Sequence, residues 1–96
     1  MFSSSLSLPV EVGALWPLGL PLDIQSGSTQ AATLELYDND VLVASASNST
    51  QLEYTANYTT AGPHEIRLEA ETPEGETQTQ TWSFSTALVV ENLAPE

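Results

Sequence analysis

The stretch YTTAGPHEIRLEAETPEGETQTQTWSF, residues 58–84, decides the fold of this chain. Within residues 63–71, apolar side chains and the single histidine alternate with charged ones, which is the two-residue period of a half-buried strand. The segment TPEG is typical of a turn, and residues 76–86 alternate again, with Trp82 and Phe84 on the face predicted to be buried. This stretch therefore predicts two long antiparallel strands joined by a turn.

Outward from this pair, the rest of the chain also predicts strands and turns rather than helices. The predicted strands lie at residues 2–12, 20–25, 34–37, 41–46, 51–59, 63–71 and 76–86. Pro9 places the first of them at a sheet edge. Trp16 and Pro17 are placed in a loop, and SGSTQ at 26–30 in a polar turn. Seven strands separated by turns are typical of an all-β antiparallel sandwich, with a barrel as the alternative closure.

The composition predicts one folded domain over residues 1–96, with strand-like apolar ends at 2–12 and 87–93. Apolar residues make up 41% of the chain, enough to bury one modest core. Cysteine is absent, which excludes disulfides and thiolate metal sites. The N-terminus lacks the pattern of a signal peptide, and no stretch reaches transmembrane length, so we expect a mature chain, an excised one, or one exported by another route.

The charge balance is strongly acidic. Ten glutamates and three aspartates face a single base, Arg67, which gives a net charge of −12. Such a surface cannot release counterions from phosphates and is repelled by anionic lipid, so nucleic-acid binding and membrane insertion are not expected. Self-repulsion that salt would screen suits a halophilic source. A merely acidic surface protein explains the same composition equally well.

Three segments in order resemble the immunoglobulin-like modules of bacterial and archaeal surface proteins, including their polycystic-kidney-disease-type (PKD-like) relatives. They are LELYDNDVLVAS at 34–45, YTTAGPHEIRLEA at 58–70 and EGETQTQTWSF at 74–84. The resemblance covers about half of the chain and implies an immunoglobulin-like β-sandwich. The cysteine pair and central tryptophan of antibody domains are missing, so kinship with antigen receptors is not implied.

No residue pattern predicts catalysis, and we expect no enzyme. His64 is the only imidazole, and the strand register aims it at the core or its rim, as expected of a packed histidine. Tyr58 is predicted to tie a crossover to the backbone through its hydroxyl. Asp38, Asn39 and Asp40 place three hard oxygen side chains in one turn, an incomplete calcium-binding pattern for which a simple turn is the favoured alternative. No other cofactor is predicted.

Two further sets of residues are candidates for modification and assembly. Asn48 and Asn57 begin the sequons NST and NYT and are candidates for glycosylation. The apolar ends are expected to pair with each other, or with neighbouring subunits by strand addition. The assembly candidates are Phe2, Leu6, Leu8, Val10, Val12, Leu88 and Val90.

The sequence therefore predicts a non-enzymatic structural subunit or module of an extracellular assembly. A cell-surface layer, a filament and a decoration on a virion all fit, with copies of the chain or neighbouring subunits as partners. The alternative is a spacer, or a module that binds protein or carbohydrate, within a larger secreted protein, with Trp16 and Tyr37 as contact candidates.

Overall fold

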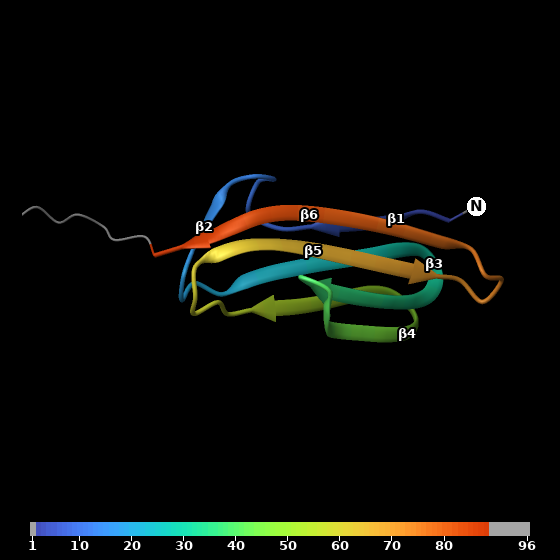
Figure 1. Ribbon diagram of the computed structural model, residues 1–96. Coiled ribbons are helices and arrows are strands. Elements are labelled where there is room, and N and C mark those ends of the chain that lie inside the picture. Colours follow the sequence, from blue (N-terminus) through green and yellow to red (C-terminus); the bar gives the residue numbers. More distant parts are fainter. Residues whose placement is uncertain (1, 89–96) are drawn as a thin grey trace, which may run out of the picture.

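The structure, a computed structural model, describes residues 2–88 of the chain. Every regular element in this range is a β-strand, as the alternating patterns predict. The strands are β1 (Ser4–Ser7), β2 (Leu15–Pro17), β3 (Leu22–Asp38), β4 (Val41–Ala56), β5 (Gly62–Glu71) and β6 (Thr77–Ala87), as Figure 1 shows. Among residues 2–88, no helix is long and apolar enough to cross a membrane.

β3 and β4 are the longest strands, and each takes part in both layers of the fold. The first half of β3 pairs with β1 and with the second half of β4, where Leu22 lies opposite Ala56. The second half of β3 pairs with the first half of β4 and with β5, where Leu36 lies opposite Leu68. β6 follows beside β5, and β2 ends this second layer by pairing in parallel with β6. The protein is therefore an all-β, immunoglobulin-like β-sandwich.

The continuity of β3 and β4 corrects the sequence prediction. The predicted turn at 26–30 lies inside β3, and residues 47–50, which the prediction placed between two strands, lie inside β4. Both segments bend where the strand passes from one layer to the other: Asn48 adopts a positive φ of 50°, and a Cβ at Gly27 would lie only 3.1 Å from the carbonyl oxygen of Thr50. Predicted strands 20–25 and 34–37 therefore merge into one strand, as do 41–46 and 51–59.

The N-terminal region also differs from the prediction. In place of one strand over residues 2–12, β1 has four residues, and the chain then crosses to the other layer. Pro9 follows β1 and has no N–H with which to continue the pairing. Trp16 and Pro17, predicted in a loop, belong to β2, whose edge position tolerates the proline. Of the predicted strand-like end at 87–93, the structure describes only Ala87, which ends β6, and Leu88.

The core lies between the two layers and follows the predicted alternation of β5. Ile66, Leu68 and Ala70 are buried, whereas Glu65 and Glu71 on the opposite parity are exposed. The fully buried large side chains are Leu22, Ile24, Leu34, Leu36, Ile66 and Leu68. Phe84 is buried as predicted, and the half-buried Trp82 packs against the core.

The described chain enters and leaves the sandwich at opposite ends. The backbone N–H of Ser4 donates to the side-chain oxygen of Gln78 at the start of β6, at 2.8 Å. The chain leaves past Ala87, at the other end of the same strand. Eleven strand residues span about 35 Å, and Figure 1 shows the N-terminal end and the end of β6 far apart along the long axis. We call the surface built by residues 12–20 and 85–88 the exit pole.

Candidate functional site

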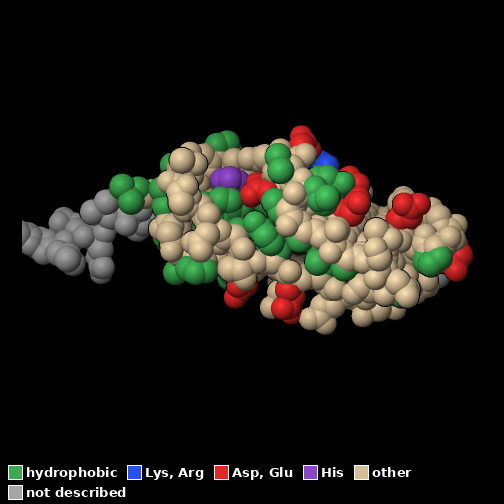
Figure 2. Space-filling view, turned by 90° about the horizontal axis from the view of Figure 1, so that it is seen from below, with side chains coloured by type: hydrophobic (Ala, Val, Ile, Leu, Met, Phe, Trp, Pro, Cys, Tyr) green, Lys and Arg blue, Asp and Glu red, His purple; other side chains and the backbone are tan. Residues whose placement is uncertain are grey.

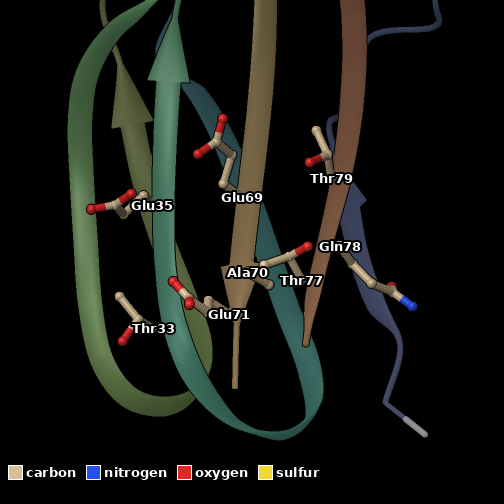
Figure 3. A pocket seen from close by; sticks show the side chains of 8 residues that line it. All are labelled: Thr33, Glu35, Glu69, Ala70, Glu71, Thr77, Gln78 and Thr79. Atoms are coloured by element: carbon tan, nitrogen blue, oxygen red, sulfur yellow. The ribbon is translucent and has the colours of Figure 1, made fainter. Parts of the chain in front are cut away.

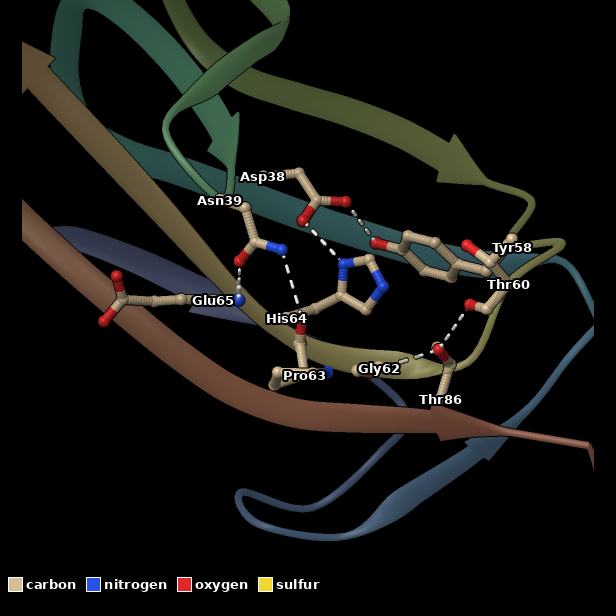
Figure 4. A network of polar contacts seen from close by, with 9 residues as sticks. All are labelled: Asp38, Asn39, Tyr58, Thr60, Gly62, Pro63, His64, Glu65 and Thr86. Atoms are coloured by element: carbon tan, nitrogen blue, oxygen red, sulfur yellow. Dashed lines mark hydrogen bonds and ion pairs between the residues drawn. The ribbon is translucent and has the colours of Figure 1, made fainter.

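A polar cluster joins three segments of the second layer. Asp38 ends β3, His64 lies near the start of β5, and Tyr58 lies in the connection between β4 and β5. One oxygen of the Asp38 carboxylate accepts a hydrogen bond from the Tyr58 hydroxyl at 2.7 Å, and the other accepts one from His64 Nδ1 at 2.8 Å (Figure 4). The Tyr58 ring lies 4.1 Å from the imidazole, which itself stacks on Phe84 at 5.6 Å. The Asp38 carboxylate therefore links the connection between β4 and β5 to the end of β3 and to the start of β5.

The setting of this cluster suits a structural role. The side chains of His64 and Asp38 are only 16% and 14% exposed. Burial, and then the hydrogen bond to Asp38, raise the pKa of Tyr58 well above its usual range, so the phenol stays protonated. The nearby hydroxyl of Thr86 donates to the carbonyl oxygens of Thr60 and Gly62 at 3.0 and 3.3 Å (Figure 4). Its proton is therefore used in hydrogen bonds within the fold.

Two predictions from sequence can be compared with this geometry. His64 was predicted to be packed, and it lies half-buried against two aromatic rings. Tyr58 was predicted to bond to the backbone, whereas its hydroxyl bonds to the Asp38 side chain. The difference arises because Asp38, the last residue of β3, faces the connection that contains Tyr58. The two residues are far apart in sequence, so local sequence patterns do not predict their contact.

The turn between β3 and β4 uses all three of its polar side chains within the fold. Asn39 and Asp40 have φ values of 50° and 69°, the left-handed backbone of a two-residue hairpin turn. The Asn39 side chain donates to the Pro63 carbonyl at 3.1 Å and accepts from the Glu65 N–H at 2.9 Å. Asp40 bonds to Arg67, and Asp38 belongs to the polar cluster.

The calcium candidate therefore has all three of its side chains already bonded to protein groups. Within residues 2–88, no group of three or more His, Cys, Asp or Glu side chains could hold a metal ion. Calcium binding by Asp38, Asn39 and Asp40 stays a prediction, which calorimetric titration with millimolar calcium tests. Heat of binding would support the predicted calcium site, and the absence of both heat and a thermal shift would contradict it.

The outer face of β3, β5 and β6 is acidic and hydroxyl-rich. A shallow hollow of about 330 Å³ on this face is lined by Thr33, Glu35, Glu69, Glu71, Thr77 and Thr79, among others (Figure 3). Glu35 lies directly opposite Glu69. Arg67 contacts Glu69 at 2.9 Å and also Asp40, and its guanidinium lies 4.5 Å from the centre of the Tyr37 ring. The single cation of the chain is therefore neutralised locally.

Both sequon asparagines have exposed side chains. Asn48 sits at the bend inside β4, and Asn57 directly follows the last residue of that strand. This exposure meets the steric requirement for glycosylation, and the modification itself stays a prediction.

The assembly candidates fall into two groups. Phe2, Leu8 and Val10 are buried in the core of this same domain, and Leu6 packs against that core. A contact between folded subunits cannot reach the three buried side chains, because the N-terminal segment folds back onto its own sandwich instead of extending from it. Val12 and Leu88 are exposed, and Val90 lies outside the described residues.

The exposed candidates belong to the exit pole, which the sequence prediction identified only in part. The segment VGALWPLGLPL, residues 12–22, contains no charged or polar side chain except the indole N–H of its tryptophan. Four large apolar residues of this pole are strongly exposed: Val12 (65%), Leu15 (63%), Leu20 (46%) and Leu88 (71%). Hydrophobic side chains are visible at the left end of the space-filling view in Figure 2. The run of apolar residues in a very acidic chain is the signal that could have located it.

Hydrogen bonds to the end of β6 fix the shape of the exit pole. The Gly13 N–H donates to Ser83 O at 2.8 Å, and the Leu18 N–H donates to Ala87 O at 3.0 Å. Between them, Trp16 of β2 lies opposite Thr86 and donates its indole N–H to Leu20 O at 2.8 Å. The exposed leucines are therefore held on an ordered backbone. Trp16 itself is half-buried against the core, and Tyr37 is covered by Arg67, which limits both as contact candidates.

Comparison with known proteins supports the fold. No protein-family model and no curated protein sequence matches the chain. Among solved structures it is similar to the fibronectin(III)-like modules of CbhA from Clostridium thermocellum, with a TM-score of 0.69 and 14% sequence identity over 91% of this chain and 100% of that one. At this identity the likeness concerns the fold alone. It supports an immunoglobulin-like β-sandwich, and it does not confirm the PKD-like subgroup.

Proposed function

We propose that the protein is a non-enzymatic structural or interaction module of an extracellular assembly. The observation that carries the proposal is the exit pole, an exposed and ordered apolar surface on a chain of net charge −12. Exposed apolar patches on a folded protein mark interaction sites. His64, Tyr58 and Arg67 carry functional groups that enzymes use in catalysis. Each of these side chains is bonded to a carboxylate of the same protein.

Composition supports the extracellular location. Serine and threonine cover the solvent-facing positions of β6, and both sequon asparagines are exposed. A net charge of −12, with its one basic residue already paired, favours solubility outside the cell. A surface layer, a filament and a virion decoration all remain compatible with these features.

A second candidate is a spacer or binding module within a larger secreted protein. The opposite placement of chain entry and exit favours it, because modules joined in line require ends about a domain length apart. The solved structure that resembles this chain is itself described as a module of CbhA.

One experiment tests the location and separates the two candidates. An antibody raised against the purified protein is applied to intact cells or particles of the source and then to a denaturing gel of the same material. Labelling of intact material is expected, and labelling only after lysis would overturn the proposal. A band near the 10.3 kDa of this chain indicates a subunit, whereas a much larger band indicates a module of a longer polypeptide.

A further inference from the structure

We propose that the exit pole binds the exit pole of a second copy of this chain, forming a two-fold dimer that salt strengthens. The inference rests on the proposed role as an interaction module and names the partner. Its surface consists of Val12, Leu15, Leu20 and Leu88, held in place by β2 and the end of β6.

The distribution of charge makes this pole the place where two copies can approach. Residues 12–22 and 77–88 carry no charged side chain, although the chain has 13 acids. The acids nearest to the pole in sequence are Glu11, Asp23 and Glu91. Glu65 lies opposite Ser83, whose carbonyl accepts the Gly13 N–H, and so also borders the pole. Two copies that meet pole to pole therefore keep the carboxylates of the outer face and of the turn before β6 apart, and salt screens the repulsion between the acids that border the pole.

Other occupants fit the pole less well. A cationic partner would be drawn to the glutamates on the outer face of β5, where Glu69 and Glu71 lie, and not to an uncharged surface. An anionic membrane would be repelled by the net charge. A head-to-tail contact would press the leucines against the opposite end of the sandwich, where Glu74 and Glu76 are exposed, and would desolvate carboxylates without partners. A two-fold contact instead places apolar side chains against apolar side chains, because both copies present the same patch.

The size of the apolar patch determines how tightly the two copies are expected to bind. Four exposed aliphatic residues form a patch on the order of a few hundred Å², below the roughly 800 Å² per partner of a stable interface. The dimer should therefore be transient and visible only at high protein concentration. Screening the repulsion between two copies of charge −12 should tighten it about fivefold between 0.05 and 1 M NaCl.

Sedimentation equilibrium of the full chain, at several concentrations up to the millimolar range and at both salt concentrations, tests the proposal. The wild type is expected to show a monomer–dimer equilibrium that tightens with salt. The double variant Leu15→Ser/Leu88→Ser is expected to stay monomeric. The matched control Val41→Ser/Leu42→Ser removes two similarly exposed residues at the start of β4, which β3, β5 and β6 separate from β2, and should dimerise like the wild type.

Three results would overturn the proposal. The first is a wild type that remains monomeric at every concentration and both salts. The second is equal loss of the dimer in both double variants, which would place the contact elsewhere. The third is a chain ending at Leu88 that dimerises when the full chain does not, which would make residues 89–96 the occupant of the pole.

Thermal melting of each variant separates loss of association from loss of folding. If Leu15→Ser/Leu88→Ser does not fold, methyl NMR of the wild type on dilution replaces it: shifts confined to the exit pole support the dimer, and shifts elsewhere contradict it. None of these results affects the antibody experiment, so the dimer can fail while the extracellular role stands.

Discussion

Asp38 shows how one carboxylate can organise several segments. It is the common acceptor for Tyr58 and His64, which come from the crossover and from β5. Hydrogen bonds to a charged group contribute about 1.5–3 kcal/mol, more than neutral ones. The alternation in residues 51–59 predicts that Tyr58 faces inward, but the identity of its partner depends on where β3 ends.

Replacing Tyr58 with Phe removes one hydroxyl from this cluster and keeps the ring. We expect the free energy of unfolding to fall by about 1–2 kcal/mol, because Asp38 loses one of its two donors. Urea denaturation at neutral pH measures the change. Tyr54→Phe is the matched control, since Tyr54 also packs against the core and its hydroxyl has no hydrogen bond within residues 2–88. Equal effects of the two substitutions would contradict the structural role of the Tyr58–Asp38 bond.

The raised pKa of Tyr58 also predicts a specific dependence on alkaline pH. A phenol whose folded pKa lies above the ordinary value of 10.0 stabilises the fold fully below pH 10 and loses that contribution as the pH rises further. Each pH unit above 10 removes about 1.4 kcal/mol from the wild type but nothing from this position in Tyr58→Phe. The stability curves of the two proteins should therefore converge near pH 11. Parallel curves between pH 9 and 11 would show that Tyr58 ionises equally in both states.

At the level of elements, β1 is an edge strand whose outer side is closed by side chains. Gln78 and Gln80 of β6 reach the backbone of β1: the Gln78 amide bonds to Ser4 N and Phe2 O at 2.8 Å, and the Gln80 amide to Ser4 O at 3.2 Å. Amide side chains can both donate and accept, so they occupy the groups that an incoming strand would use. This arrangement opposes strand addition at β1, which was one of the two pairings that the sequence analysis put forward for the N-terminal end.

Substituting both glutamines tests this edge protection. Gln78→Ala/Gln80→Ala should lower the free energy of unfolding by about 2 kcal/mol, since partly buried backbone groups lose their partners, and should increase light scattering at high concentration. Thr79→Ala is the control, because Thr79 lies between them on the solvent-facing side of β6. Unchanged scattering in the double variant would show that β1 does not need the amides to resist pairing.

The sequence predicts the faces of the strands better than their ends. Alternation correctly assigns the buried positions of β5 and the inward face of Trp82 and Phe84, and the residue types of the Asp38–Asp40 run correctly predict the hairpin turn. It fails where small polar residues bend a strand without interrupting it, as at Gly27 and Asn48. β2 was missed because a three-residue strand depends on pairing with β6, about 70 residues away, and leaves no periodic signal of its own.

The whole molecule is dominated by uncompensated negative charge. Arg67, the only arginine or lysine of the chain, is held by Asp40 and Glu69, so no second arginine or lysine offsets the remaining acids. On the outer face, Glu35 lies opposite Glu69 in the β3–β5 register, and like charges in directly opposite positions destabilise a sheet. The fold tolerates this arrangement best when salt screens it.

Stability should therefore depend on salt, and Glu35 offers a direct test. We expect the melting temperature of the wild type to rise by several degrees between 0.05 and 1 M NaCl, since screening removes about 1–2 kcal/mol of repulsion. Glu35→Gln keeps the oxygen that accepts the Tyr37 hydroxyl but removes one charge, and should stabilise the protein at low salt by about 0.5 kcal/mol, a benefit that disappears at 1 M. Glu74→Gln, in the exposed turn before β6, provides the control for lowering net charge alone and should have a smaller effect. A wild-type melting temperature that does not change with salt would contradict the proposed repulsion between acidic side chains. It would also contradict the halophilic interpretation of the composition.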